Sequence, residues 1–303
     1  MTTETDSTAQ GTGLVAAGVP PAEREDWFTG ERHVYEPHRV GLPPLGAYVR
    51  ELWRRRAFAV ELSRTNLRAQ HFNTAFGQLW LVLNPILLAT VYFILVDIIR
   101  RGGRPPGYFE HLVAGIFAYY FVSGAVRESA KSVVGGGRLI LNTAFPRALL
   151  PLSYVHTAFA RFLPTMAIYA VLHVATGRPV GLVDLWLIPI VAILTVLSSG
   201  LAMLVGAAQV YFRDLSSFLP YILRIWLYIS PVLYYPDKVP HGYKFLLAAN
   251  PLGPPLTAWS DVLSFGKAPG VLAMGLGAAW ALFFLVVGAV FFLSREREFA
   301  VRL

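Results

Sequence analysis

The sequence predicts an all-α integral membrane protein with six transmembrane helices. Of its 303 residues, 55% are hydrophobic and only 15% carry a charge, which is too apolar for a soluble domain of this length. The apolar residues gather in runs that are long enough, at about 1.5 Å of rise per residue, to cross a hydrocarbon layer of about 30 Å. Basic or Pro/Gly-rich segments separate these runs, as expected of a multi-pass protein.

The composition also excludes several classes of function. The chain has no cysteine, so disulfides, thiolate metal sites and cysteine nucleophiles are excluded. Its net charge of +8 is typical of some nucleic-acid-binding proteins. In a membrane protein, however, the Lys/Arg bias of cytoplasmic loops and attraction to anionic lipids explain such a charge more simply. We therefore expect no nucleic-acid partner.

The N-terminal part divides into a tail and an amphipathic segment. Residues 1–40 contain no sustained apolar run and no secretory signal pattern, which predicts a flexible cytoplasmic tail. Residues 41–74 place apolar and cationic side chains at helical spacing, which predicts an amphipathic helix at the membrane surface. A solvated helix packed on another soluble domain is the alternative. The arginines expected to lie near lipid phosphates are Arg54, Arg55, Arg56 and Arg64.

The transmembrane domain is expected over residues 75–303. Its first span covers about residues 76–99 and contains Pro85, which should kink the helix. The second apolar run, at about 111–126, is short for a full crossing. We expect it to continue as a helix through Lys131 into the cytosol.

The basic segment 127–148 superficially resembles a nucleotide-binding loop around Lys131 and Ser132. That loop requires glycines where this chain has Ala125 and Ala130, so its phosphate cradle is absent. We expect the chain not to bind ATP by itself.

The middle of the chain predicts one short helix and two further spans. Gly135–Gly137 should separate the second span from a short helix near residues 139–143. The third span, at about 149–176, contains His156 and Arg161. These two side chains share a face only loosely, and we expect either of them to pair with another group of the bundle. The fourth covers about residues 182–210.

The fifth span, within residues 209–236, has an arginine at its centre. The charged pair Arg213-Asp214 opens into about twenty mostly apolar residues that contain Arg224. A cation that faces lipid costs at least about 2.5–3.5 kcal/mol, so Arg224 should face protein or a watery path. Snorkelling or a structural ion pair is the alternative. Helical spacing puts Ser217, Tyr221, Arg224, Tyr228 and Tyr235 near one stripe.

Two short helices and a sixth span complete the domain. Apolar pieces at about 243–249 and 256–265 are too short to cross, which predicts shallow re-entrant helices on the outer side. The sixth span covers about residues 271–293. Six crossings place both termini on one side, and that side carries about two thirds of the 26 Lys and Arg residues. The positive-inside rule therefore predicts that both termini are cytoplasmic.

Several stretches together resemble the ABC-2 type permeases of polysaccharide exporters, which transport O-antigen, teichoic acid and related cell-wall glycans. The similarity begins near residue 45, and the stretches lie in the family's order and spacing. Tyr119 and Tyr120 stand where a tryptophan is common in the family. The composition and tail are also similar to those of actinobacterial galactan exporters. The matching stretches are GQLWLVLNP (77–85), LVAGIFAYYF (112–121), LILNTAFPRALLPLS (139–153), VYFRDLSSFLPYILRIWLYISPVLY (210–234) and AANPLGPPLTAW (248–259).

The resemblance implies a homodimer in the cytoplasmic membrane that works with two copies of a separate ABC ATPase subunit. ATP and Mg²⁺ would then bind to the partner, and this chain would hold no cofactor or metal. The implied substrate is a lipid diphosphate-linked polysaccharide, which the surface-helix arginines would bind before transport. An ordinary basic loop that caps its own helices is the alternative to an ATPase contact. The implied contact residues are Leu139, Ile140, Asn142, Phe145 and Arg147, with a smaller contact at Arg213 and Asp214.

A glycan path needs flat aromatic rings, because sugars present apolar C–H faces between rings of hydroxyl groups. An aromatic belt at the membrane interface would explain some of the same side chains. The candidate path residues are Phe117, Tyr120, Phe121, Tyr221, Arg224, Tyr228 and Tyr235.

Two other classes of function fit the sequence less well. An integral membrane enzyme that acts on lipid-linked sugars usually needs clustered carboxylates, histidines or metal ligands, and the chain has neither D-x-D nor H-E-x-x-H. An ion-coupled carrier favours paired acidic groups near the midplane, where only Asp97 comes close.

Overall fold

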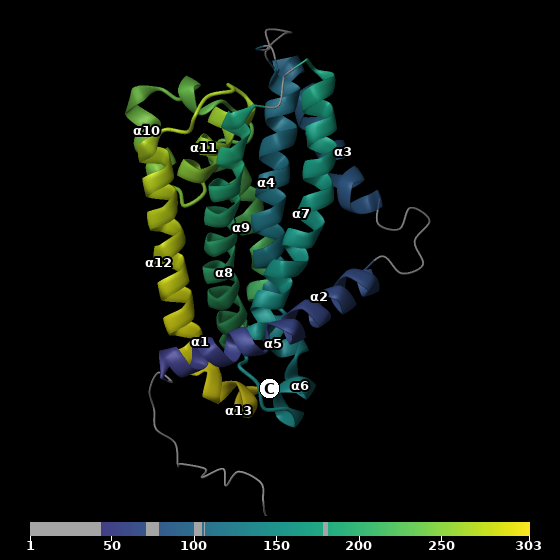
Figure 1. Cartoon of the computed structure of the whole chain (residues 1–303), viewed down its shortest axis with the longest axis vertical. Coiled ribbons are helices and arrows are strands. Elements are labelled where there is room, and N and C mark those ends of the chain that lie inside the picture. The colour runs from purple at the N-terminus through teal and green to yellow at the C-terminus, as the bar shows by residue number, and fades with distance from the viewer. Residues whose placement is uncertain (1–43, 71–78, 100–104, 106, 178–180) are drawn as a thin grey trace, which may run out of the picture. The chain divides into compact units, whose positions relative to one another are not determined.

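The computed structural model describes residues 44–70, 79–99, 105, 107–177 and 181–303, and in these residues the secondary structure is entirely helical (Figure 1). The tail predicted at residues 1–40 lies outside the described residues. The fold class predicted from composition, an all-α membrane protein, is confirmed.

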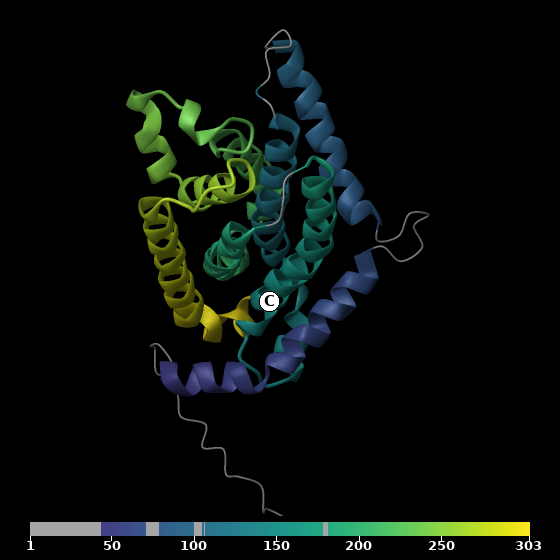
Figure 2. The same cartoon turned by 45° about the horizontal axis from the view of Figure 1, so that its top comes forward.

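The amphipathic segment forms two helices where the sequence predicted one. Helix α1 (Leu45–Arg54) and helix α2 (Arg56–Gln70) meet at a bend at Arg55 (Figure 2). The Arg55 side chain donates to Glu51 and, through Nη1, to the Ala144 carbonyl oxygen at 2.6 Å. The bend is thus tied to the segment that precedes the third long helix. No spacing of apolar residues encodes this long-range contact, which is why the sequence missed the bend.

Five helices among the described residues are long and apolar enough to cross a membrane. Helix α4 lies at the centre of the bundle, with 78% of its span buried, against 17% for α3. As predicted, α4 continues past the apolar run, but it ends at Ser129 and does not reach Lys131, which precedes the separate helix α5 (Ser132–Gly135). The five are α3 (Trp80–Ile99), α4 (Tyr108–Ser129), α7 (Leu149–Ala175), α8 (Leu187–Tyr211) and α12 (Val271–Arg295).

The fifth predicted span is shorter than expected. Helix α9 (Leu215–Ile229) has 15 residues, so at about 1.5 Å per residue it is shorter than a hydrocarbon layer of about 30 Å. It ends because Ser230 precedes Pro231 and adopts an extended backbone with ψ 149°, as the residue before a proline prefers. Among the residues that the structure describes, five helices are therefore long enough to cross and α9 is shorter, so six crossings stay a prediction.

Short helices gather at the two ends of the bundle (Figure 1). We call these the α6 end and the α10 end. Both the short helix predicted after the glycines and the two predicted before the last span are present, close to their expected positions. The α6 end carries α5 (Ser132–Gly135), α6 (Gly137–Asn142) and α13 (Phe299–Arg302), and the α10 end carries α10 (Lys244–Ala249) and α11 (Gly253–Leu263).

Close packing holds the ends and the bundle together. At the α10 end, the buried Trp259 of α11 donates from Nε1 to the Ala114 carbonyl of α4 at 3.0 Å. Helices α8 and α12 approach so closely that a Cβ built on Gly288 would lie 2.0 Å from the Gly200 carbonyl oxygen. Only glycine permits this crossing, as is common between membrane helices.

Candidate functional site

Helix α9 has two faces, as its sequence predicted. It buries Leu219, Leu223 and Leu227 against the bundle. The opposite face leaves Tyr221 66% exposed and Tyr228 46% exposed, with Arg224 also exposed in the single chain. The isoleucines Ile222, Ile225 and Ile229 are exposed as well, so this face is mixed rather than purely polar.

Side chains of α3, α4 and α9 surround a cavity of about 360 Å³, which we call the tyrosine cavity. The hydroxyl groups of Tyr92 and Tyr228 lie 3.3 Å apart across it, and their rings meet edge to face at 6.3 Å. Three residues predicted for the glycan path line this cavity: Tyr120 from α4, and Arg224 and Tyr228 from α9. The polar and aromatic lining is Tyr92, Tyr119, Tyr120, Ser123, Arg127, Arg224 and Tyr228.

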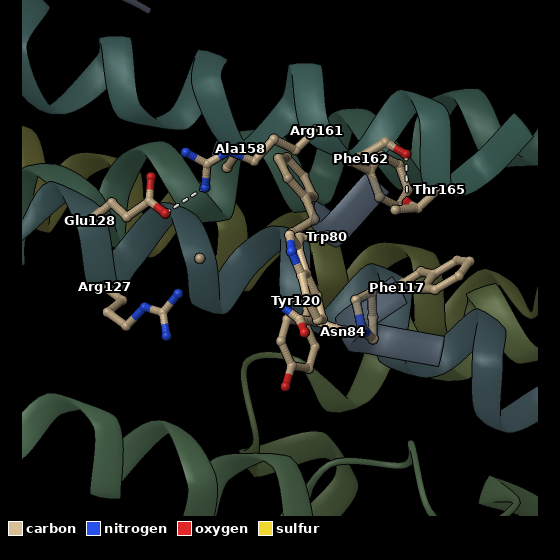
Figure 3. A pocket seen from close by; sticks show the side chains of 13 residues that line it. Trp80, Asn84, Phe117, Tyr120, Arg127, Glu128, Ala158, Arg161, Phe162 and Thr165 are labelled. Atoms are coloured by element: carbon tan, nitrogen blue, oxygen red, sulfur yellow. Dashed lines mark hydrogen bonds and ion pairs between the residues drawn. The ribbon is translucent and has the colours of Figure 1, made fainter. Parts of the chain in front are cut away.

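A second cavity of about 230 Å³, the arginine cavity, lies between α3, α4 and α7 (Figure 3). Arg161 Nη1 lies 2.5 Å from Glu128 Oε1, and the two side chains are only 16% and 15% exposed. The predicted pairing of Arg161 within the bundle is confirmed. Phe117 and Phe121, both predicted for the glycan path, also line this cavity.

The two cavities share Tyr120, Gly124 and Arg127 as lining residues. A Cβ built on Gly124 would meet no atom within 4 Å. The sequence missed Tyr92, Tyr119 and Arg127, although a cation about two turns beyond Tyr120 on α4 was a signal available for Arg127.

Two predicted path residues lie elsewhere. Because α9 ends at Ile229, the helical stripe cannot extend to Tyr235. Tyr235 is buried instead, with its ring centroid 4.2 Å from His111 and 5.4 Å from Phe265. Tyr221 lies on the exposed face of α9, outside the residues that line the two cavities.

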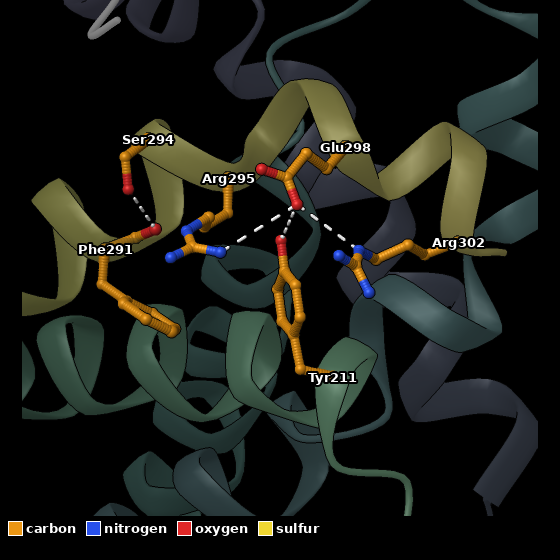
Figure 4. A network of polar contacts seen from close by, with 6 residues as sticks. All are labelled: Tyr211, Phe291, Ser294, Arg295, Glu298 and Arg302. Atoms are coloured by element: carbon orange, nitrogen blue, oxygen red, sulfur yellow. Dashed lines mark hydrogen bonds and ion pairs between the residues drawn. The ribbon is translucent and has the colours of Figure 1, made fainter. Parts of the chain in front are cut away.

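At the α6 end, a charged network fastens the C-terminal segment to Tyr211 at the end of α8 (Figure 4). Tyr211 donates its hydroxyl to Glu298 Oε2 at 2.6 Å, and Arg302 Nε lies 3.4 Å from the same oxygen. The Arg302 guanidinium also stacks 4.4 Å above the Tyr211 ring. Arg295 completes the network at 4.0 Å from Glu298.

The residues predicted to contact an ATPase divide into inner and outer groups. Ile140 is 5% exposed, and the Arg147 backbone N–H donates to Glu296 Oε1 at 2.6 Å. Both therefore serve the fold of this chain, and burial leaves Ile140 no surface for a partner. Leu139 and Phe145 pack against the same small core and are half-buried. Asn142, Arg213 and Asp214 are exposed.

The outer side of α6 presents two residues that the sequence analysis missed. Leu141 is 61% exposed, and Arg138 is exposed beside it. An exposed leucine next to an arginine at the same end as Arg213 and Asp214 forms a mixed surface suited to a protein partner.

Comparison with protein families supplies the deciding observation. The family model described as "ABC-2 type transporter" matches residues 58–264 of this chain. The chain belongs to the ABC-2 type transporter family. The matched range contains every residue that lines the tyrosine and arginine cavities, together with α6.

Within the ABC-2 type transporters, the chain is similar to permeases of O-antigen export systems. An O-antigen export system permease protein RfbA of Klebsiella pneumoniae is 30% identical over 209 residues, which cover 68% of this chain and 80% of that protein. A protein of the same name from Myxococcus xanthus is 28% identical over 255 residues, which cover 83% of this chain and 97% of that protein.

The surface-helix arginines fall largely before the ABC-2 match, and most of them pair with carboxylates. Arg54 Nη2 lies 2.7 Å from Glu51, and Arg64 lies 3.5 Å from Glu61. Hydrogen bonds from Arg54 and Arg55 hold the pKa of the Glu51 carboxyl below its usual value. Only Arg56 of the four has no carboxylate partner in the described part of the chain, and it stacks 4.9 Å from the Trp53 ring.

Proposed function

We propose that this chain is the membrane-spanning permease subunit of an ATP-driven ABC exporter for a lipid-linked polysaccharide of O-antigen, teichoic-acid or galactan type. One observation carries the proposal: the ABC-2 match spans the segment that forms the two cavities, in a chain that is similar to O-antigen export permeases over 68% of its length. A bundle of apolar helices that encloses tyrosines and arginines is suited to a polar polymer, because rings stack on sugar C–H faces while the polar groups bind hydroxyls.

The exposed face of α9 supports a homodimer as part of this proposal. Arg224 and Tyr221 project from this face, and a cation that faces lipid is costly. A second copy of the chain would cover the face and extend the tyrosine cavity into a conduit. Exposed apolar side chains on α3, such as Val91 and Ile98, supply a surface for the same contact.

The ATPase subunit is proposed to dock on the outer side of α6. Leu141, Arg138 and Asn142 offer an apolar anchor between polar groups, and Arg213 with Asp214 offers a smaller contact at the same end. ATP and Mg²⁺ would reside on that subunit. The α6 end would then face the cytoplasm, with both termini on that side of the cytoplasmic membrane.

Leu141→Asp tests the docking surface. A carboxylate in place of an exposed apolar anchor should abolish co-purification of the ATPase subunit and its stimulation by this chain, because interface cores exclude unpaired charge. Leu182→Asp is the matched control, since Leu182 is 85% exposed at the opposite end. Wild-type stimulation by the Leu141→Asp variant would remove α6 from the contact.

The transport function itself is tested in reconstituted vesicles. Vesicles that contain this chain and its ATPase should move lipid-linked glycan when ATP is supplied, and vesicles that contain the chain alone should not. Transport by the chain alone, or turnover of the glycan lipid into a new compound, would contradict the proposal.

A further inference from the structure

The Glu128–Arg161 ion pair leaves part of Arg161 unsatisfied. Glu128 engages Nη1 of Arg161 at 2.5 Å. The other two guanidinium nitrogens, Nε and Nη2, are buried and have no hydrogen-bond partner among the residues that the structure describes. Buried N–H groups of a cation cost free energy unless an acceptor meets them. The site therefore favours an additional oxygen-rich group.

A second cation lines the same cavity. Arg127 is exposed and forms no ion pair within the described ranges. Figure 3 shows its guanidinium group at the Glu128 end of the cavity, where Arg161 also ends. Two guanidinium groups against one carboxylate leave a positive excess at this cavity, and the charge of the largely buried Arg161 is screened less than it would be in water.

The neutral lining suits the rest of an anionic ligand. Trp80 and Tyr120 present aromatic rings to the cavity, and Asn84 presents an amide. At Gly124, where no Cβ intrudes, this lining continues toward the tyrosine cavity and its Arg224. An anion bound at Arg161 would thus lie at one end of a surface whose other end suits sugars.

We propose that the arginine cavity binds a phosphate ester, with the diphosphate that joins lipid to glycan as its ligand. Guanidinium groups bind phosphate oxygens in bidentate geometry, which would satisfy the two buried nitrogens of Arg161. Arg127 supplies the second cation. Glu128 orients Arg161 and competes with the ligand for it. The identity of the ligand rests on the proposed function. This site replaces the arginines of the surface helix as the expected binding site of the diphosphate, because most of those arginines are paired with carboxylates.

Binding to the full-length chain tests the site without the ATPase. The protein in phosphatidylcholine nanodiscs is titrated with farnesyl diphosphate, with farnesol and with inorganic pyrophosphate, and heat of binding is measured. Farnesyl diphosphate should bind and farnesol should not. Phosphatidylglycerol added to the nanodiscs distinguishes the source: competition identifies a lipid headgroup as the natural ligand, and its absence favours the isoprenoid diphosphate.

Variants that remove a charge should change the affinity for farnesyl diphosphate in opposite directions. Arg127→Gln should weaken the Kd for farnesyl diphosphate by about tenfold or more, as should the neutral pair Glu128→Gln/Arg161→Gln, which avoids leaving Glu128 unpaired. Glu128→Gln alone should strengthen binding, because it removes the competing carboxylate. Lys244→Gln is the control, since Lys244 is an exposed cation of α10 that does not line this cavity.

Unchanged affinity in the Arg127→Gln and paired variants, or weaker binding in Glu128→Gln, would overturn the site. So would equal binding of farnesol and farnesyl diphosphate. If binding fails while vesicles containing the ATPase still export glycan, only this inference is lost and the proposed function stands.

Discussion

Tyr228 lies where three helices meet at the tyrosine cavity. Its hydroxyl lies 3.3 Å from that of Tyr92, a long contact that contributes little, whereas its ring forms part of the wall. Tyr228→Ala should therefore reduce glycan export about two- to tenfold, the effect expected for losing a stacking contact of about 0.5–1.5 kcal/mol. Tyr228→Phe keeps the ring and should export nearly normally. The rates are measured in reconstituted vesicles at equal protein density, and equal export by both variants would exclude stacking at this residue.

Tyr48 joins α1 to the segment before α7. Its hydroxyl oxygen accepts from the Ala148 N–H at 3.3 Å, and burial together with the nearby Glu296 charge raises the pKa of Tyr48 well above its ordinary value. Tyr48→Phe should lower the free energy of unfolding by about 1 kcal/mol at neutral pH. The measurement is thermal unfolding in detergent, followed by size-exclusion chromatography.

The pH dependence of this contact has a definite sign. The folded state keeps the Tyr48 proton, so the stabilisation is complete below the unfolded pKa of about 10 and declines as pH rises above it. Wild type should lose stability relative to Tyr48→Phe above about pH 10. Parallel stability curves for the two proteins would show that Tyr48 is not held neutral by its surroundings.

At the scale of elements, apolar runs predicted where the long helices lie, whereas the end of α9 and the bend between α1 and α2 depend on other features. The runs located α3, α4, α7, α8 and α12, because a span must be apolar along its length. The length of α9 depends on Ser230 and Pro231, a local signal that its apolar composition masked. The bend at Arg55 depends on the carbonyl of Ala144, 89 residues away, and no local pattern predicts it.

Some site residues could be recognised from the sequence, and others only from the folded structure. Tyr120, Arg224 and Tyr228 stand out because polar side chains are rare in apolar helices. The burial of Ile140 was not predicted, because α6 is short, and six residues do not define a buried face by periodicity. Leu141, its exposed neighbour, could be distinguished only after the core at the α6 end was known.

The crossing of α8 and α12 makes a prediction at this scale. Gly288→Val should disrupt the fold, because a Cβ at this position would lie 2.0 Å from the Gly200 carbonyl oxygen and 2.8 Å from its carbon. Overpacking of a core typically costs about 1–3 kcal/mol, and a clash with backbone cannot be relieved by a rotamer change. Gly275→Val on the same helix is the control, because its Cβ would meet nothing within 4 Å. Equal thermal stability of the two variants would contradict the tight crossing.

At the scale of the whole transmembrane domain, the two ends differ in what they offer. The α6 end combines the hydrogen-bond network around Glu298, the exposed Leu141 and the exposed Arg213. The α10 end carries α11, which packs on α4 through the buried Trp259. One end thus exposes polar and apolar side chains together, as the proposed docking of a protein requires, and the other packs a short helix on the central one.

The assignment of these ends to the two sides of the membrane gives the last prediction. The chain contains no cysteine, so a single introduced cysteine reports its own side without background. Asn142, Asp214 and Gly242 are exposed, and α9 separates the last two. With six crossings and a cytoplasmic α6 end, an impermeant maleimide should label Asn142→Cys and Asp214→Cys only in inside-out vesicles. It should label Gly242→Cys only in right-side-out vesicles. Labelling of Asp214→Cys and Gly242→Cys from the same side would show that the 15-residue α9 does not complete a crossing. Labelling of Asn142→Cys from outside would invert the orientation and leave α6 beyond the reach of any ATPase in the cytoplasm.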